Sequence, residues 1–144
     1  MTIHIATDHA GFDHKQALKT YLESKGYTVV DHGAFAKDPN DDYPDFIVPC
    51  AEAVADTFGD MGIIFGGSGE GEQMAANKVT GIRACEYYGG NIEIVKLSRE
   101  HNDANILSIG ARFVSIEDSI IATQIWLDTA FSGDERHERR IEKF

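Results

Sequence analysis

The chain has 144 residues, of which 42% are hydrophobic, and carries a formal net charge of −11 at pH 7. This length fits a single domain, residues 1–144, that can bury a full core. The negative charge argues against binding to nucleic acid, which requires a basic surface, and no apolar run is long enough to cross a membrane.

The N-terminus enters a strand pattern directly, without a charged and then apolar leader, so we expect a cytoplasmic protein. Cys50 and Cys85 are the only cysteines and lie far apart, without histidines at a spacing suited to a metal. We therefore expect both to be reduced and buried, and we predict no metal site.

Short apolar runs alternate with segments of helical periodicity along the chain. The predicted strands cover residues 3–6, 27–31, 61–65, 82–85 and 106–110. The predicted helices cover residues 12–25, 46–58, 90–99, 116–130 and 134–144, and one more helix follows the glycines after residue 66 and runs to about residue 78. Pro49 is expected in the first turn of the second helix. This alternation predicts an α/β, doubly wound, three-layer fold around a five-stranded parallel sheet.

Polar residues follow the first two predicted strands. Asp8 and His9 come directly after the first strand, where ligands collect in an open parallel sheet. Asp8 could equally serve only as a helix N-cap. Residues 35–44 are polar and contain two prolines, so we expect a surface loop that could reach over a site.

The third strand leads into glycines at positions 66, 67, 69 and 71 and then into good helix formers. Such a junction binds oxyanions, because backbone N–H groups converge at the start of a helix. Ser68 adds a hydroxyl donor to this loop. Glu70 and Glu72 place carboxylates beside the loop. A carboxylate base next to oxyanion donors can remove a proton from the carbon next to a carbonyl group.

Simpler interpretations of this loop remain open. Glu72 could merely favour the first helical turn through the helix dipole, and Glu70 could be solvated. A nucleotide could also bind a glycine-rich turn. However, the loop lacks a P-loop lysine, and it follows the third strand rather than the first, unlike a dinucleotide fingerprint.

The second half of the chain holds two further polar clusters. Residues 98–105 are crowded with groups that donate or accept protons, and Arg112 lies just past the fifth strand. The last nine residues gather Arg136, Arg139, Arg140 and Lys143. These cations could be a solvated helix end. Because the segment offers little apolar surface of its own, we expect it to dock on a second copy in a homodimer.

Several motifs in one order resemble the sugar-phosphate isomerases related to ribose-5-phosphate isomerase type B and the galactose-6-phosphate isomerase subunits. The resemblance covers essentially the whole chain. The motifs are Asp8-His9-Ala10-Gly11, Asp42-Tyr43-Pro44, the segment 66–78, Ser98-Arg99-Glu100-His101-Asn102-Asp103 and the pair Arg136 and Arg140.

This resemblance implies a Rossmann-like dimer or tetramer that converts an aldose phosphate to its ketose through an enediolate, without cofactor or metal. Many members use a cysteine at the end of the third strand as the base. Gly66 stands at that position here, which departs from the pattern. A second branch uses a glutamate one turn later, and Glu72 matches it. The missing cysteine also allows a catalytically silent subunit that only binds a sugar phosphate.

The resemblance assigns a role to each matching residue. Glu72 is the base, Ser68 and the N–H groups of Gly67 to Gly71 stabilise the enediolate oxygen, and His101 opens the sugar ring with a share from Asp8. The residues that bind the substrate are His9, Tyr43, Gly67, Gly69, Glu70, Gly71, Asn102, Arg112, Arg136 and Arg140. Of these, His9 and the three arginines form the phosphate clamp, and Arg136 and Arg140 come largely from the partner subunit.

A glutamate with its ordinary pKa is a weak base for a carbon acid. We predict that burial against Ile64, Phe65 and Met74 raises the pKa of Glu72, against the lowering effect of the helix dipole. The identity of the sugar depends on the dimensions of the pocket. We expect residues 35–43 and 87–91 to determine which sugar the pocket accepts.

Overall fold

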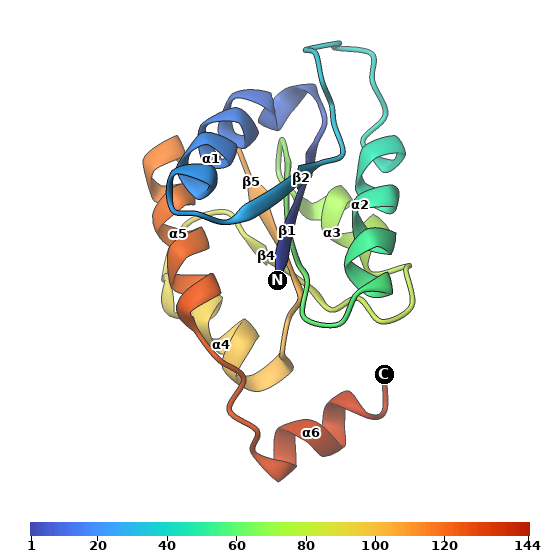
Figure 1. Ribbon diagram of the computed structural model, residues 1–144, viewed down its shortest axis with the longest axis vertical. Coiled ribbons are helices and arrows are strands. Elements are labelled where there is room, and N and C mark those ends of the chain that lie inside the picture. The colour runs from blue at the N-terminus through green and yellow to red at the C-terminus, as the bar shows by residue number, and fades with distance from the viewer.

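The computed structural model describes all residues from 1 to 144 and contains one parallel sheet with the strand order β2-β1-β3-β5-β4 (Figure 1). The strands are β1 Thr2–Thr7, β2 Thr28–Asp31, β3 Met61–Gly66, β4 Ala84–Tyr87 and β5 Ile106–Gly110. The helices are α1 Phe12–Ser24, α2 Pro44–Asp56, α3 Glu70–Ala76, α4 Glu93–Asn102, α5 Ile116–Asp128 and α6 Glu135–Ile141. A short 3-10 turn, η1 His9–Gly11, precedes α1.

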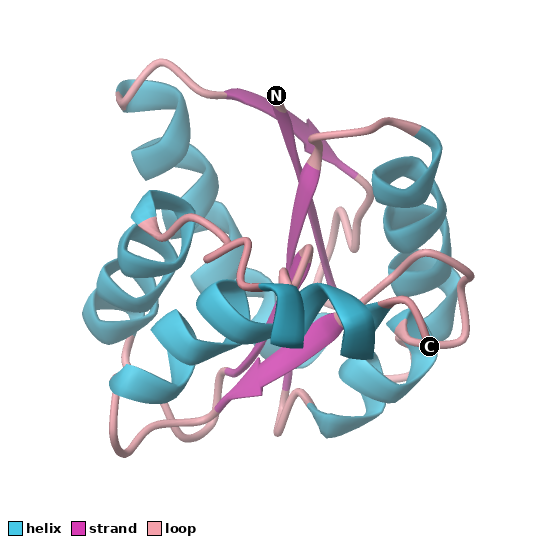
Figure 2. Cartoon of the chain, turned by 90° about the horizontal axis from the view of Figure 1, so that it is seen from below, coloured by secondary structure: helices cyan, strands magenta, loops and turns pink.

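Helices cover both faces of the sheet, which gives the predicted three-layer α/β fold (Figure 2). On one face α1, α4 and α5 enclose a core that includes Leu18, Leu22 and Trp126. On the other face α2 and α3 enclose a smaller core that includes Ile47 and Ala76. The central strand β3 is buried along its whole length, as its continuous apolar sequence indicates.

Helices α2 and α4 are displaced by two or three residues from their predicted ranges. Helix α2 begins at Pro44, so Pro49 lies in the second turn and not in the first. Pro44 takes the first helical position instead, where its missing N–H costs no hydrogen bond. Helix α4 continues through His101 to Asn102 and ends at Asp103 in a left-handed conformation with φ of 45°. The polar segment 98–102 is therefore helical.

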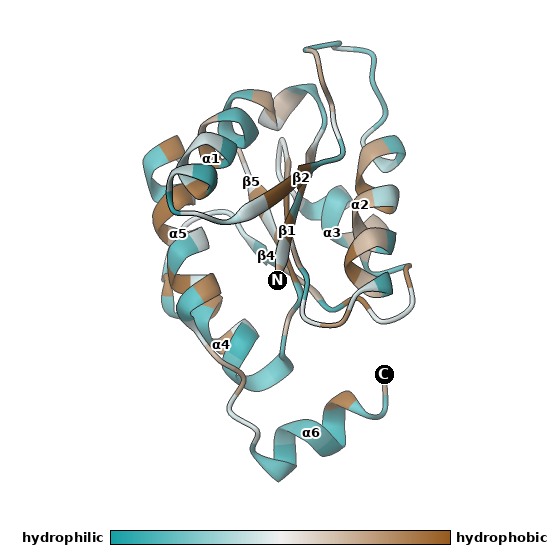
Figure 3. Ribbon diagram, viewed as in Figure 1, coloured by the Kyte–Doolittle hydropathy of each residue, from teal (hydrophilic) through white to brown (hydrophobic).

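Helix α6 lies at the bottom of Figure 1 and is mostly hydrophilic (Figures 1 and 3). It contacts α4 through His137, whose ring stacks on that of His101 at a centroid distance of 4.3 Å. Arg136 and Arg140 are exposed. Helix α6 therefore presents most of its surface to its surroundings. The predicted partner subunit for this helix stays a prediction.

Neither cysteine forms a disulfide, and Cys50 is buried whereas Cys85 is half-buried. Burial raises the pKa of the Cys85 thiol to about 11, so the thiol stays protonated at neutral pH. None of the helices combines the length and the apolar character that crossing a membrane would require.

Candidate active site

The chain changes direction between β1 and β3, and the segments that follow these strands meet at one edge of the sheet. From β1 the chain first builds β2 at one side, and it returns past β1 to place β3 on the other side. In such sheets, ligands bind beyond the carboxyl ends of the strands at this switch point. Asp8 follows β1, the glycine loop 66–71 follows β3, and Arg112 follows β5.

The glycine loop offers free backbone donors. The N–H groups of Gly67, Ser68, Gly69 and Gly71 donate no hydrogen bond within the chain. Gly69 has a φ of +85°, a conformation that side chains rarely adopt, and this turns the chain into α3. The hydroxyl oxygen of Ser68 accepts from the N–H of Glu70 at 3.3 Å and keeps its own proton available. The loop thus has the donors that an oxyanion requires.

Glu72 turns its carboxyl group back over Gly66 instead of toward solvent. The residue is only 4% exposed, and a Cβ atom at position 66 would collide with its carboxylate. The glutamate carboxyl thus occupies the space that any side chain at the end of β3 would need. A residue that acted only through the helix dipole would not require this burial, so the simpler interpretation of Glu72 explains less of the geometry.

Burial raises the pKa of Glu72 against the lowering effect of its own backbone N–H, and with a smaller contribution from the Asp8 carboxylate the pKa reaches about 7. The predicted direction is therefore confirmed. The predicted surroundings are partly wrong, because Met74 is exposed, whereas Ile64 and Phe65 are fully buried. A carboxyl group with a pKa near neutrality can act as a base at neutral pH.

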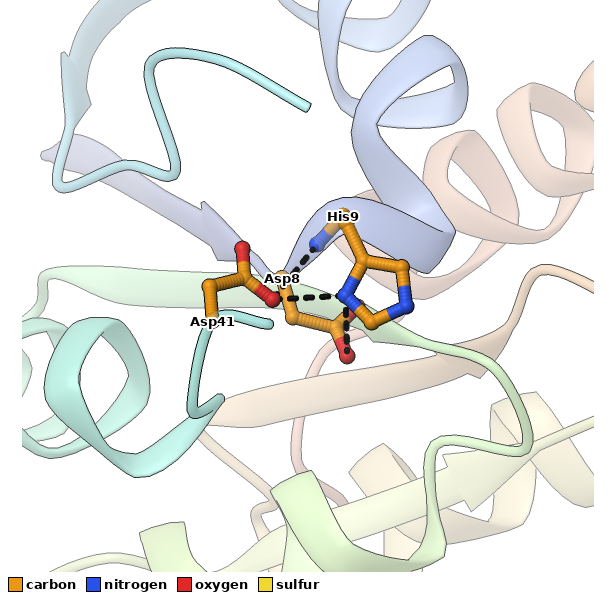
Figure 4. Close-up of side chains that lie close together, drawn as sticks. All are labelled: Asp8, His9 and Asp41. Carbon is orange, nitrogen blue, oxygen red and sulfur yellow. Dashed lines mark hydrogen bonds and ion pairs between the residues drawn. The ribbon is translucent and has the colours of Figure 1, made fainter. Parts of the chain in front are cut away.

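Asp8, His9 and Asp41 form a cluster beside the loop (Figure 4). The Nδ1 atom of His9 lies 2.6 Å from Oδ1 of Asp41 and 3.8 Å from Oδ2 of Asp8. Asp8 also accepts from the N–H of Ala10 at 2.9 Å, so it caps η1 as well as facing the site. The hydrogen bond to Asp41 raises the pKa of His9 above its ordinary value, and the charge of Asp8 adds to this.

Side-chain atoms of Asp8, His9 and Asp41 lie close enough together to hold a cation, since one ligand atom from each lies within 4.8 Å of the others. However, His9 and Asp41 already contact each other directly through such atoms. An ion would have to separate this pair. The arrangement suits an anion better, because the hydrogen bond to Asp41 favours the protonated ring and leaves its second nitrogen, Nε2, available to donate.

We expect Asp41→Asn to lower the pKa of His9 toward the value of a free histidine, because the largest cause of the raised pKa is lost. NMR titration of the His9 ring measures this shift. Asp42→Asn, which removes an exposed neighbouring carboxylate, is the control and should leave the titration of His9 unchanged. An unchanged pKa in Asp41→Asn would contradict the pairing.

Two further predicted residues lie against the glycine loop. The guanidinium of Arg112 packs over Gly67, with Nη1 3.0 Å from the point that a Cβ atom would occupy there, and the charge of Arg112 also acts on His9. The hydroxyl of Tyr43 lies 2.7 Å from the corresponding position at Gly71. Glycine at both positions leaves room for these side chains.

Glu70 is half-buried at the start of α3, so it is not fully solvated.

The remaining predicted residues lie elsewhere in the protomer. Helix α4 runs from the carboxyl end of β4 back to the amino end of β5, so its last residues, His101 and Asn102, lie at the opposite end of the sheet from Glu72 (Figure 1). Arg136 and Arg140 lie on α6, which packs against α4. A single protomer therefore does not bring these four residues to the glycine loop, and the expectation that Arg136 and Arg140 reach the site from a partner subunit stays a prediction.

Sequence reasoning missed Asp41, which holds His9 in place. The signal available was its position two residues before Tyr43, in a loop expected to reach over the site. Nothing in the sequence pattern distinguished it from its acidic neighbour Asp42. The hydrogen bond becomes visible only when the loop and the end of β1 are placed in space.

Comparisons with known proteins agree on one family. The sequence profile of the family described as Ribose/Galactose Isomerase matches residues 3–144. Ribose-5-phosphate isomerase B of Mycolicibacterium paratuberculosis is 39% identical over 142 residues, which cover 99% of this chain and 88% of that protein.

Solved structures give the same result. The crystal structure of ribose-5-phosphate isomerase B from Mycoplasma genitalium with bound ribulose-5-phosphate aligns with a TM-score of 0.93 at 39% identity, covering 99% of this chain and 92% of that one. The enzyme of the same name from Clostridium thermocellum aligns with a TM-score of 0.93 at 41% identity, covering 99% and 94%. Sequence and fold therefore point to the same relatives along the full chain.

Proposed function

Because this chain belongs to the ribose/galactose isomerase family, we propose that it interconverts ribose 5-phosphate and ribulose 5-phosphate. It is a sugar-phosphate isomerase of the aldose–ketose type. The observation that carries the proposal is the buried carboxyl group of Glu72, which lies over Gly66 beside a loop with free N–H groups. This pairing of a base with oxyanion donors is what proton transfer next to a carbonyl requires.

In the proposed mechanism, Glu72 takes the proton from C2 of the open-chain aldose and returns it to C1. The electron pair left by the proton gives an enediolate, whose negative oxygen accepts hydrogen bonds from the loop. The free N–H groups and the Ser68 hydroxyl are the donors we assign to it. The protonated carboxyl then delivers its proton to C1 while the hydroxyl proton on O2 passes to O1, which leaves the carbonyl group at C2. The base and the acid that act on carbon are thus the same group.

The phosphate binds away from the reacting carbons. We assign it to Arg112, which is cationic, and to His9, whose raised pKa favours the protonated ring; both lie beside the glycine loop. Binding a part of the substrate that does not react positions the carbon that loses its proton. Tyr43 would line the sugar, and Asp8 would bind its oxygens near the ring. Gly67, Gly69, Glu70 and Gly71 would form the floor of the pocket.

We further propose that a second copy of the chain completes the site in a homodimer, within a tetramer if dimers pair again. His101, Asn102, Arg136 and Arg140 lie together at the far end of the protomer and leave α6 largely exposed. A twofold arrangement that brings this end of one copy to the glycine loop of the other would supply the ring-opening acid and two more phosphate ligands. Arginine suits this task because its planar fork matches phosphate.

A complementation experiment tests the shared site. Mixed dimers of Glu72→Gln and a double variant, Arg136→Ala with Arg140→Ala, contain one site with both lesions and one with neither. An equal mixture of exchanging subunits should therefore recover about a quarter of the wild-type rate. Mixing Glu72→Gln with Gly66→Ala is the control and should recover nothing, because both lesions lie in the same half of the site. No recovery in the first mixture would contradict the shared site.

The substrate is tested by assaying the purified protein with a panel of phosphorylated aldoses and ketoses. We expect the highest kcat/KM for ribose 5-phosphate and ribulose 5-phosphate. A preference for a six-carbon or four-carbon sugar phosphate would support the isomerase activity but show that ribose 5-phosphate is not the substrate. Binding without turnover of any sugar would favour a silent subunit.

A further inference from the structure

A second buried carboxyl group, that of Glu86, lies beneath the glycine loop and has no role in the mechanism above. Glu86 is on β4, directly opposite Ser108 of β5. Both of its carboxyl oxygens are buried and make no hydrogen bond. A Cβ atom at Gly69 would collide with this carboxyl group, so the acid packs against the residue that begins the turn into α3.

The surroundings of Glu86 contain no partner that would stabilise a negative charge. Glu70 and Glu72 face it from α3 and carry the same charge. The Ser108 hydroxyl donates its proton to the carbonyl oxygen of Gly69 at 2.8 Å, so it can only accept from Glu86 in that arrangement. Arg83 and His101 line the same 650 Å³ pocket between α3, β4 and α4, yet neither forms an ion pair with Glu86.

We propose that Glu86 is a positioning residue which stays a neutral carboxylic acid beneath Gly69, and that this neutrality lets the loop above it hold a negative oxygen. The inference rests on the proposed function, since the negative oxygen is that of the enediolate. An ionised carboxylate under the loop would repel this oxygen and counteract the N–H groups that face it.

The protonation behaviour of Glu86 supports the proposal. Burial, reinforced by the charges of Glu70 and Glu72, raises the pKa of Glu86 to about 8. Glu86 is thus neutral at pH 7 and ionises as the pH rises. Turnover should increase as Glu72 loses its proton near pH 7 and decrease as Glu86 loses its own, which gives a narrow bell-shaped profile.

The pH dependence of kcat in Glu86→Gln tests this role, because glutamine has nearly the same shape and never ionises. One pH unit above the pKa of Glu86, wild-type turnover should be about tenfold below its plateau. Glu86→Gln should lose this alkaline decrease, and Glu86→Asp, which can still ionise, should keep one. Glu93→Gln removes an exposed carboxylate on α4 and should retain the wild-type profile. The same alkaline decrease in Glu86→Gln would overturn the proposal.

A second readout does not depend on turnover. Carbon-13 NMR of the glutamate carboxyl carbons should reveal one that titrates near pH 8 in the wild type and is missing in Glu86→Gln. If no such carboxyl exists, the inference about Glu86 is wrong whatever the enzyme does. If it exists but no sugar phosphate is converted, the proposed function is wrong and the neutral acid at position 86 still stands.

Discussion

Replacing Glu72 by glutamine is expected to lower kcat for ribose 5-phosphate by about three orders of magnitude, the range lost when a general base is removed. KM should change little, since the proposed phosphate ligands are elsewhere. Steady-state kinetics between pH 5.5 and 9 measure both constants. The wild type should gain activity through about pH 7, where Glu72 ionises, and this acidic limb should be missing from the residual activity of the variant.

Folding stability provides an internal check on the same variant. The pKa of Glu72 is raised on folding, so its contribution to stability is greatest at low pH and is lost as the pH rises through about 7. Glu72→Gln should therefore melt at the same or a higher temperature than the wild type at pH 8 while being nearly inactive. Glu117→Gln removes an exposed acid from the first turn of α5 and serves as the control for helix-dipole effects. Wild-type turnover in Glu72→Gln would refute its assignment as the base.

Adding a single methyl group at the end of β3 should also lower kcat strongly. In Gly66→Ala the new Cβ occupies the space of the Glu72 carboxyl, which must move away from the reacting carbons. A displacement of about 1 Å in a catalytic group can cost on the order of 100-fold in rate, so we expect at least this loss in kcat.

The double variant Gly66→Ala with Glu72→Gln shows whether the two changes act through one group. If the methyl group acts only by displacing the carboxyl, the double variant should be about as slow as Glu72→Gln alone. Thermal unfolding of all three variants separates a displaced side chain from a disrupted strand. If the losses in kcat of the two single variants multiply in the double variant, Gly66→Ala lowers kcat by a route other than displacing the Glu72 carboxyl.

The fold could be predicted from the sequence because strand and helix patterns alternate along the chain and short loops join them. The errors in the predicted fold concern the ends of helices, where the same residue type can stand at more than one position. Pro49 fits the first turn of a helix, but Pro44 fits it as well and comes earlier. The predicted helix stopped at residue 99, although the polar residues up to Asn102 form its last, partly buried turn.

One part of the candidate site was predictable, namely the residues that come directly after strands. Residues after β1, β3 and β5 must meet at one edge of the sheet, and the structure brings Asp8, Glu72 and Arg112 there. His101 precedes β5, so the same rule places it at the other edge. Its assignment to the site came from family resemblance, and one chain alone contains no information on how a second copy packs.

The burial of Glu86 could not be foreseen from its position in β4. It stands in a strand next to Tyr87 and Tyr88, and an acid in a short edge strand is ordinarily solvated. The left-handed turn at Gly69 moves α3 over that strand and covers the carboxyl. A buried acid of this kind therefore depends on tertiary packing rather than on a local pattern.

The proton transfer assigned to Glu72 is tested most directly by following deuterium at C2 of labelled ribose 5-phosphate by NMR. With the wild-type protein, deuterium should leave C2 and appear at C1 of the ketose or in water. With Glu72→Gln, it should remain at C2 over the same period, although the variant still binds the sugar phosphate. Loss of deuterium at the wild-type rate in Glu72→Gln would contradict the account.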